Sequence, residues 1–306
     1  MNSVTEELLK IISDYDGEGF KGAYNIREDG QCAGRMSSEN IKIESKQDAP
    51  GLVITIKPHT VGERVFIPAC VTHSGVDDLV YNDFYVGEGA DVTIVAGCGV
   101  HNTGEEEARH NGIHRFFIEE GASVVYEEKH IGTGESSGPR KIDPVTDVTL
   151  ADNAKLTMDT VQLGGVDFTS RVTRGVLGKN ARLIIRERLM TDGTEQAKTD
   201  FEVVLKGEDS GVDLMSRSVA KGNSYQEYRS VIKGENRCTG HSECDAILVG
   251  NGKVSAAPEL VASHCDAALI HEAAIGKIAG EQILKLRTLG LTEEEAEQKI
   301  ISGFLK

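Results

Sequence analysis

The fold is decided by four copies of one short unit: GEGADVTIV (87–95), EEGASVVYE (119–127), ADNAKLTMD (151–159) and GKNARLIIR (178–186). Each copy is a Gly- or Asn-containing turn followed by apolar and β-branched residues, which is typical of a strand. Similar units follow at KGEDSGVDL (206–214), KGENRCTGH (233–241) and VASHCDAAL (261–269). Alignment on Ala90, Ala122, Ala154, Ala181, Gly211, Arg237 and Cys265 gives steps of 32, 32, 27, 30, 26 and 28 residues.

A quasi-period of this length, built from strands and tight turns, indicates a solenoid in which each coil covers the apolar face of the previous one. Strand-like alternation begins at Gly51, and helical periodicity does not return until about residue 279. We therefore predict a mainly β fold with a β-helix core over residues 51–278. A sandwich of antiparallel hairpins is the alternative, but a single recurring anchor favours coiling.

The two ends of the chain have different patterns. Residues 3–13 place apolar side chains at helical spacing behind a Ser-x-x-Glu capping box, so we predict one helix there. Residues 14–50 complete an irregular lead-in, apart from a possible strand at 40–44. Residues 279–306 predict two helices, the second opened by the capping signature of Thr292.

Composition narrows the classes of function. The chain has 306 residues and a formal charge of −16, which argues against a nucleic-acid partner because such binding needs clustered Lys and Arg. No run reaches the 18 apolar residues of a membrane span, and the N-terminus lacks the pattern of a signal peptide. We expect a soluble, cytoplasmic protein with no membrane partner, whose six cysteines are reduced.

No motif for nucleotide hydrolysis or acyl transfer is present. The sequence has neither a G-x-x-x-x-G-K-[ST] phosphate loop nor a G-x-S-x-G elbow. We therefore expect a protein that is not itself an enzyme.

Side chains that bind metals concentrate between residues 238 and 278. This stretch holds three of the six cysteines, three of the nine histidines and the pair His271-Glu272. Thiolate, imidazole and carboxylate all bind iron or zinc. There is no C-x2-C pair, which argues against a zinc ribbon, and Cys244 precedes an apolar run expected to form a strand.

The repeat supplies an expected geometry for this stretch. A 28-residue step from Cys244 leads to Glu272 on the next coil, and stacked strands lie about 4.8 Å apart. We expect these two side chains to share one metal centre. Neighbouring residues of a strand point to opposite faces, so His271 is expected to face away, toward a second subunit.

Three motifs carry a resemblance to a known family. HSECDAILVG (241–250), HEAAIGKI (271–278) and EQILKLRTLGLTEEEAEQKIISGF (281–304) resemble the C-terminal core of SufB/SufD iron–sulfur cluster assembly scaffolds. The resemblance implies a right-handed parallel β-helix and a transient iron–sulfur cluster, expected to be [4Fe–4S]. It also implies that a SufC-type ABC ATPase docks on the C-terminal helices, over residues 279–306.

The resemblance extends to single residues. Cys244 matches the cysteine associated with cluster assembly, Glu272 a nearby carboxylate, and His271 the histidine contributed across the SufB–SufD interface. Because one chain carries both halves, a homodimer is the simplest expectation. Cys98 matches the position that accepts persulfide sulfur, and we expect its thiol to be exposed at a Gly-Cys-Gly turn that ends a strand.

Other candidates stay open. Cys32, Cys70, Cys238 and Cys265 are expected to be small buried hydrophobes. The pairs Cys70-x2-His73 and His110-x3-His114 are unassigned, and His241 is a possible accessory ligand. The sulfur donor is not identified, and the shortness of the chain, which resembles the compact scaffold of a minimal two-component system, leaves flavin binding in doubt.

Two other functions compete with the cluster scaffold. One is a structural, SufD-like partner of the ATPase without its own cluster, which would not need Cys244. The other is a β-helix carbohydrate-active enzyme, which 5% aromatic residues and no Trp disfavour.

Overall fold

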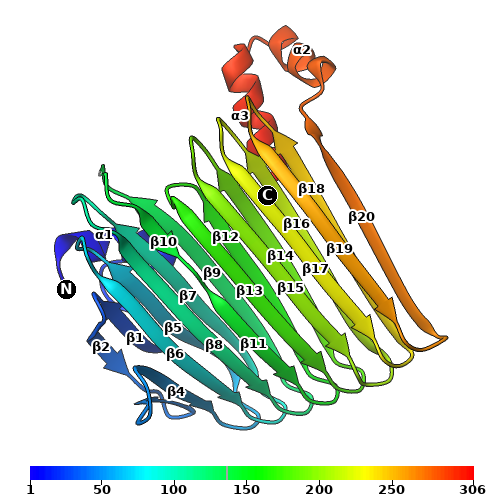
Figure 1. Cartoon of the computed structure of the whole chain (residues 1–306). Helices are drawn as coiled ribbons and strands as arrows, with labels where there is room; N and C mark the ends of the chain where they lie inside the picture. The colour runs from blue at the N-terminus through cyan, green and yellow to red at the C-terminus, as the bar shows by residue number, and fades with distance from the viewer. Residues whose placement is uncertain (136) are drawn as a thin grey trace.

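The computed structural model describes residues 1–135 and 137–306 and shows a long solenoid of parallel strands with helices at both ends (Figure 1). The helices are α1 (Ser3–Ile12), α2 (Gly280–Thr288) and α3 (Glu293–Phe304). Sheet A contains, in spatial order, β2 (Gln31–Met36), β1 (Ala23–Glu28), β5 (Val61–Val71), β7 (Asp91–His101), β9 (Ser123–Thr133), β12 (Lys155–Leu163), β14 (Arg182–Thr191), β16 (Ser210–Ala220), β18 (Cys238–Leu248) and β20 (Ala267–Lys277). Sheet B contains β19 (Lys253–Ala262), β17 (Tyr225–Gly234), β15 (Gln196–Leu205), β13 (Phe168–Leu177), β10 (Arg140–Ile142) with β11 (Val145–Leu150), β8 (Ala108–Ile118), β6 (Asp77–Val86), β4 (Gly51–Ile56) and β3 (Ile41–Ser45).

Strands that neighbour each other in a sheet pair in parallel, and the chain crosses to the other sheet between them. Thus β12 pairs with β14 without a break, from Lys155 opposite Arg182 to Leu163 opposite Met190. Among the described residues, antiparallel pairing occurs only between β1 and β2 and between β3 and β4. The predicted parallel β-helix with one N-terminal and two C-terminal helices is confirmed, and the antiparallel sandwich is wrong.

The recurring turn has a conformational cause. The residue that precedes the small anchor residue adopts a left-handed backbone in five successive coils, where φ is 62° at Gly89, 66° at Gly121, 59° at Asn153, 54° at Asn180 and 58° at Asp209. Only Gly, Asn and Asp adopt this conformation at low cost. The Gly, Asn and Asp residues of the repeat are therefore a requirement of the turn.

The core lies between the two sheets. Side chains alternate along each strand, so that every second residue of β14 points inward and is buried. Phe84 and Phe116 stack on successive coils with 4.5 Å between ring centroids, and the Tyr126 ring packs edge-on against Phe116. Burying each such side chain stabilises the fold by about 1.5–3 kcal/mol.

Helix α1 packs on the outward face of sheet A, and this explains two glycines of β7. A Cβ on Gly97 would lie 2.4 Å from the Ile12 carbonyl oxygen, and one on Gly99 would lie 2.9 Å from Leu8. Leu8, Leu9 and Ile12 are buried there, whereas Ile11, which was expected on the same face, is 47% exposed. Helix α1 therefore needs glycine beneath it.

The expected irregular lead-in contains more structure than predicted. Between residues 14 and 50 the chain forms β1, β2 and β3, and only β3 was expected. Strand β1 pairs in parallel with β5 and so extends sheet A, while β3 pairs with β4. These strands lie at the N-terminal end of the solenoid and cover its first full coil. Apolar and polar residues therefore alternate only weakly along them, and β2 has no buried residue.

The C-terminal end of the solenoid is left open. Strands β20 and β19 are the last of their sheets, and Ile270 and Ile275 are 57% and 40% exposed. Helix α2 projects beyond these strands, whereas α3 leads back toward sheet A, where Lys306 lines a hollow with Arg188 and Met215 (Figure 1). The predicted capping box is present, because the Thr292 hydroxyl accepts from the Glu295 N–H and the Glu295 carboxylate accepts from the Thr292 N–H. No helix in the described part of the chain is both long and apolar enough to cross a membrane.

Candidate sulfur and metal site

The register of the last coil differs from the expected one by a single residue. Cys244 of β18 lies opposite Ala273 of β20, and Glu243 lies opposite Glu272. The expected pairing of Cys244 with Glu272 is therefore wrong. The error lies in the last step of the repeat, which was counted as 28 residues from Arg237 to Cys265, whereas Cys238 lies opposite Ala267, a step of 29.

This one-residue shift exchanges the faces of the candidate ligands. Cys244 points into the β-helix, and His271 lies opposite Ser242 on the same inward face. The His271 Nδ1 atom lies 3.0 Å from the Ser242 carbonyl oxygen. His271 was expected to face away from Cys244, so that expectation is corrected: Glu272 is the residue on the opposite, outward face.

The Cys244 thiol is protected. It is 1% exposed and belongs to the main core cluster, beneath the open last coil. Burial, reinforced by the charges of Glu187 and Asp245, raises the pKa of Cys244 to about 12. Little thiolate therefore forms at neutral pH while the last coil keeps solvent away from Cys244.

Cys98 does not end a strand at an exposed turn. It lies inside β7, points inward and is 6% exposed, so its expected exposure is wrong. The flanking glycines, which suggested a turn, are instead the positions where α1 contacts the strand. Burial raises the pKa of Cys98 well above its ordinary value. A small cavity of about 20 Å³ lies beside Cys98, with His110 and His114 also in its lining.

A row of buried polar side chains begins next to Cys98. His130 lies opposite Cys98 on the following coil, and its Nε2 atom is 3.3 Å from the Glu128 carboxylate. The Arg171 guanidinium donates to Glu128 at 2.6 Å. Burial opposes the charge of Glu128, but Arg171 and His130 outweigh it and hold the pKa of this carboxyl well below its ordinary value.

The row continues to the coil beneath Cys244. The Arg171 Nε atom lies 3.5 Å from Glu187, and Glu187 accepts from the Ser216 hydroxyl at 2.7 Å. Ser216 lies opposite Cys244 on the next coil. We call these residues the interior row: His130, Glu128, Arg171, Glu187 and Ser216.

Polar groups beside the interior row are not fully paired. Within the described residues, the buried Thr160 and Thr173 hydroxyls have no hydrogen-bond partner. A cavity of about 10 Å³ lies next to Thr160 and is lined by Arg171 and Glu187. This volume is about that needed for one water molecule. Buried polar groups are normally satisfied, so this part of the interior has spare hydrogen-bonding capacity.

Comparison with known proteins identifies the family of the chain. Residues 81–304, well over half of the chain, match the family described as SUF system FeS cluster assembly, SufBD core domain. The chain belongs to the SufBD family. The predicted family is thereby confirmed, and the SufBD region contains Cys98, the interior row, Cys244, His271 and Glu272.

Curated relatives carry the same family name. The chain is 29% identical over 271 residues to an iron–sulfur cluster assembly SufBD family protein of Methanothermobacter thermautotrophicus, covering 86% of this chain and 64% of that protein. A second, from Archaeoglobus fulgidus, is 27% identical over 88% of this chain and 71% of its own length. A third, from Methanocaldococcus jannaschii, is 24% identical over 99% of both chains. The chain thus spans just under two thirds of the first of these relatives.

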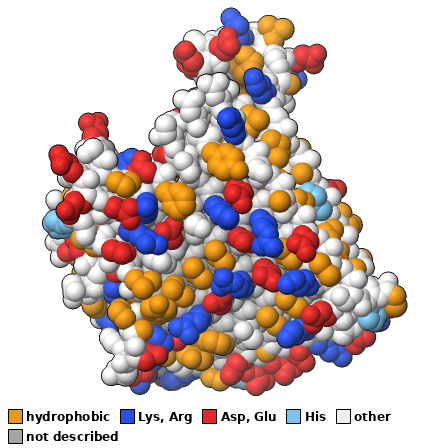
Figure 2. Space-filling view, viewed as in Figure 1, with side chains coloured by type: hydrophobic (Ala, Val, Ile, Leu, Met, Phe, Trp, Pro, Cys, Tyr) orange, Lys and Arg blue, Asp and Glu red, His pale blue; other side chains and the backbone are white. Residues whose placement is uncertain are grey.

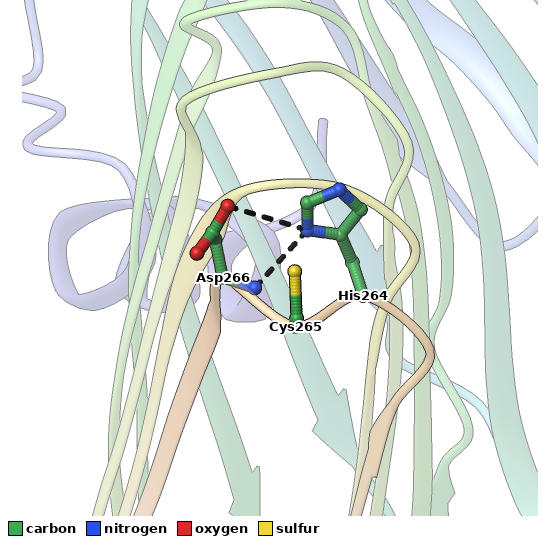
Figure 3. A group of neighbouring side chains, drawn as sticks. All are labelled: His264, Cys265 and Asp266. Atoms are coloured by element: carbon green, nitrogen blue, oxygen red, sulfur yellow. Dashed lines mark hydrogen bonds and ion pairs between the residues drawn. The ribbon is translucent and has the colours of Figure 1, made fainter.

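A further ligand group of this SufBD protein lies in the turn between β19 and β20, where His264, Cys265 and Asp266 gather (Figure 3). The Asp266 N–H donates to His264 Nδ1 at 3.1 Å, and the Cys265 sulfur points to the same side as both neighbours. Cys265 and Cys32 are exposed, so their expected burial is wrong, whereas Cys70 and Cys238 are buried as predicted. The run His-Cys-Asp was the available signal in the sequence.

The two unassigned pairs have different outcomes. His110 and His114 both point inward from β8, as their spacing in a strand predicted. His110 Nδ1 lies 3.0 Å from Asp78, and His114 Nδ1 lies 3.2 Å from the Tyr126 hydroxyl. Cys70 is fully buried but the His73 side chain is 70% exposed, so this pair does not form a shared site.

The outer surface offers no concentrated basic patch on the face shown in Figure 2, where Lys and Arg alternate with Asp and Glu. Many of these charges pair across neighbouring strands. Arg174 pairs with Asp147 at 3.2 Å, and Arg229 pairs with Asp200 at 3.0 Å. Such pairs leave few Lys and Arg side chains without an acidic partner, since the chain has 49 acidic and only 33 basic residues.

Proposed function

We propose that this SufBD protein is a non-enzymatic scaffold on which sulfur and iron are assembled into a transient iron–sulfur cluster. The observation that carries the proposal is the interior row, which joins the environments of two inward-facing thiols, Cys98 and Cys244, within the SufBD core. A structural protein would gain little from such a row, because buried charges are costly unless they serve a purpose.

Cys98 is the proposed sulfur acceptor. Its thiolate attacks the outer sulfur of a persulfide carried by a donor protein, so that a new S–S bond forms on Cys98 and the donor thiolate leaves. This exchange involves no net oxidation. The small cavity beside Cys98, which His110 and His114 also line, leaves room for the additional sulfur atom.

Cys244 and His271 are the proposed cluster ligands. They lie on the inward faces of the neighbouring strands β18 and β20, at the open end of the β-helix. Edge strands β19 and β20 present unpaired backbone groups and exposed Ile270, so a second copy of the chain is the proposed cover. A [4Fe–4S] cluster held between two such ends would receive ligands from both copies.

A SufC-type ABC ATPase is the proposed partner at α2 and α3. Helix α2 buries none of its residues, and Leu284 and Leu289 are 61% and 75% exposed. A hollow of about 520 Å³ between α2 and the β18–β19 turn includes Leu248 and Ile283 in its lining. Apolar residues left exposed around a hollow are the usual mark of a protein-binding surface.

The test is cluster reconstitution with iron and sulfide under anaerobic conditions, followed by size-exclusion chromatography. We expect the cluster absorption to elute with the dimer, and His271→Ala to retain less cluster than the wild type. The alternative, a SufD-like partner without a cluster, predicts a dimer that elutes without iron. Membership of the SufBD family leaves the carbohydrate-enzyme alternative without support.

A further inference from the structure

Three side chains on the outward face of the last coil form a cluster that the proposed function does not use. His241 and Glu243 project from β18, and Glu272 projects from β20. One ligand atom from each lies within 4.8 Å of the others. The His241 Nε2 atom is 3.5 Å from the Glu272 carboxylate. Because two strands in fixed register hold these residues, their spacing is set by the sheet.

Asp213 orients the imidazole of this cluster. Its carboxylate lies 2.9 Å from His241 Nδ1, one strand further back in sheet A. When Nδ1 carries the proton and donates it to Asp213, the Nε2 lone pair points toward Glu272. A carboxylate behind a histidine is the usual way that proteins fix the tautomer and ring orientation of a metal ligand.

The carboxylates of Glu243 and Glu272 have few basic partners. Elsewhere on the outer faces, carboxylates meet Arg or Lys on a neighbouring strand, as Asp159 meets Arg188. Here the nearest guanidinium to Glu243 is that of Arg217, at 3.9 Å. Among the described residues, His241 is the only ion-pair partner of Glu272. A bound cation would supply the missing charge.

We propose that His241, Glu243 and Glu272 bind a divalent transition-metal ion, with Asp213 as a positioning residue for His241. One imidazole and two carboxylates suit ferrous iron, and the absence of a thiolate keeps such an ion exchangeable. Identification of the ion as iron rests on the proposed function. In that setting the three side chains form a loading site, from which iron is delivered to the growing iron–sulfur cluster.

The location of the site supports this role. Glu243 and Cys244 are consecutive residues of β18, with side chains on opposite faces of sheet A. Only β20 lies between them and the open edge of the sheet. An ion released by the loading site therefore reaches the inner face by passing around a single edge strand.

The His264-Cys265-Asp266 turn is a weaker candidate for the same ion. Its three residues are consecutive, and His264 Nδ1 already accepts the Asp266 N–H. The turn contains the Cys265 thiol, and the proposed iron–sulfur site contains the Cys244 thiol, whereas His241, Glu243 and Glu272 include no thiol. Spectroscopy can therefore separate the sites, because sulfur-to-cobalt charge transfer appears only when a thiolate binds Co²⁺.

The experiment is an anaerobic titration of the full chain with Co²⁺, read by visible absorption and by calorimetry. We expect one tight Co²⁺ per chain with ligand-field bands and no sulfur-to-cobalt charge transfer. Glu243→Gln and His241→Ala should each weaken binding by more than about tenfold, and Asp213→Asn by about tenfold. Asp159→Asn, on the same outer face, is the matched control and should bind as the wild type does.

The thiol variants separate this inference from the proposed function. Cys244→Ser and Cys265→Ser should both keep the tight Co²⁺. A charge-transfer band that disappears in either variant, or unchanged affinity in both Glu243→Gln and His241→Ala, would overturn the loading site. Cluster formation in Cys244→Ser with intact Co²⁺ binding would instead overturn the proposed function alone. Circular dichroism confirms folding, and Glu243→Gln keeps the test valid if His241→Ala unfolds.

Discussion

Arg171 donates to Glu128 at 2.6 Å in the middle of the β-helix, where the two side chains are only 6% and 2% exposed. The same guanidinium lies 3.5 Å from Glu187, so one cation balances two buried carboxylates. Burial works against each of these charges, and only their pairing makes the arrangement stable. The interior row therefore depends on Arg171.

Replacement of Arg171 by Met should destabilise the protein by about 3–5 kcal/mol, because it leaves buried carboxylates without a counter-charge. Urea unfolding followed by circular dichroism measures the change. The double variant with Arg171→Met and Glu128→Gln should recover part of the loss, since one uncompensated charge is removed. An unchanged urea midpoint in Arg171→Met would contradict the assigned pairing.

Stability should fall in mild acid because of His114. Burial lowers the pKa of His114 to about 4, whereas an unfolded histidine titrates near 6.5. The unfolded chain thus binds more protons between these values, and stability decreases as the pH falls from about 6.5 to about 4. The contribution of this residue amounts to about 3 kcal/mol at pH 4.

Urea midpoints measured at several pH values test this assignment against a matched variant. His114→Gln keeps a polar group near Tyr126 but cannot titrate, so its stability should depend less steeply on pH between 6.5 and 4. Equal slopes in the two proteins would show that His114 is not responsible.

The six thiols should divide into two classes by reactivity. Cys32 and Cys265 are exposed, whereas Cys70, Cys98, Cys238 and Cys244 are buried. Burial raises the pKa of Cys70 and of Cys244 to about 12, so little thiolate is present at neutral pH. A thiol reagent should label two cysteines rapidly in the native protein and six after denaturation. Rapid labelling of Cys244 in the native protein, located by peptide mass spectrometry, would show that the last coil opens freely.

The exposed leucines of the C-terminal helices should be required for the ATPase partner. Leu284→Glu combined with Leu289→Glu should abolish co-purification of a SufC-type ATPase, because each introduces a charge at the proposed contact. Tyr225, exposed on sheet B, supplies the control variant Tyr225→Glu. Retained binding by the leucine variant would move the docking surface elsewhere.

Much of the architecture follows from local chemistry in the sequence. The left-handed turn residue recurs as Gly89, Gly121, Asn153 and Asn180, so the first steps of the repeat could be counted correctly. Beyond Ala181 the turns are less regular, and a last step counted as 28 residues where the register gives 29 placed Glu272, not Ala273, opposite Cys244. Because side chains alternate faces, one residue of error reverses inside and outside.

Other features could not be predicted because they depend on distant contacts. Cys98 was expected in an exposed turn but lies in a buried strand. Its neighbours Gly97 and Gly99 are glycines because they contact α1, which lies far away in the sequence, at the start of the chain. The interior row is assembled from four strands of two sheets, and no local motif marks it. Asp213, His241 and Glu272 likewise meet only through register between strands.

Cys244 is the proposed thiolate ligand of the cluster, and anaerobic reconstitution of Cys244→Ser is the sharpest test of this role. The hydroxyl keeps the size of the side chain but cannot supply a thiolate. Iron and sulfide content with Mössbauer spectra should show a cluster in the wild type and in the exposed-thiol control Cys265→Ser. We predict that Cys244→Ser folds, dimerises and retains no cluster; a full cluster in that variant would show that Cys244 is not a ligand.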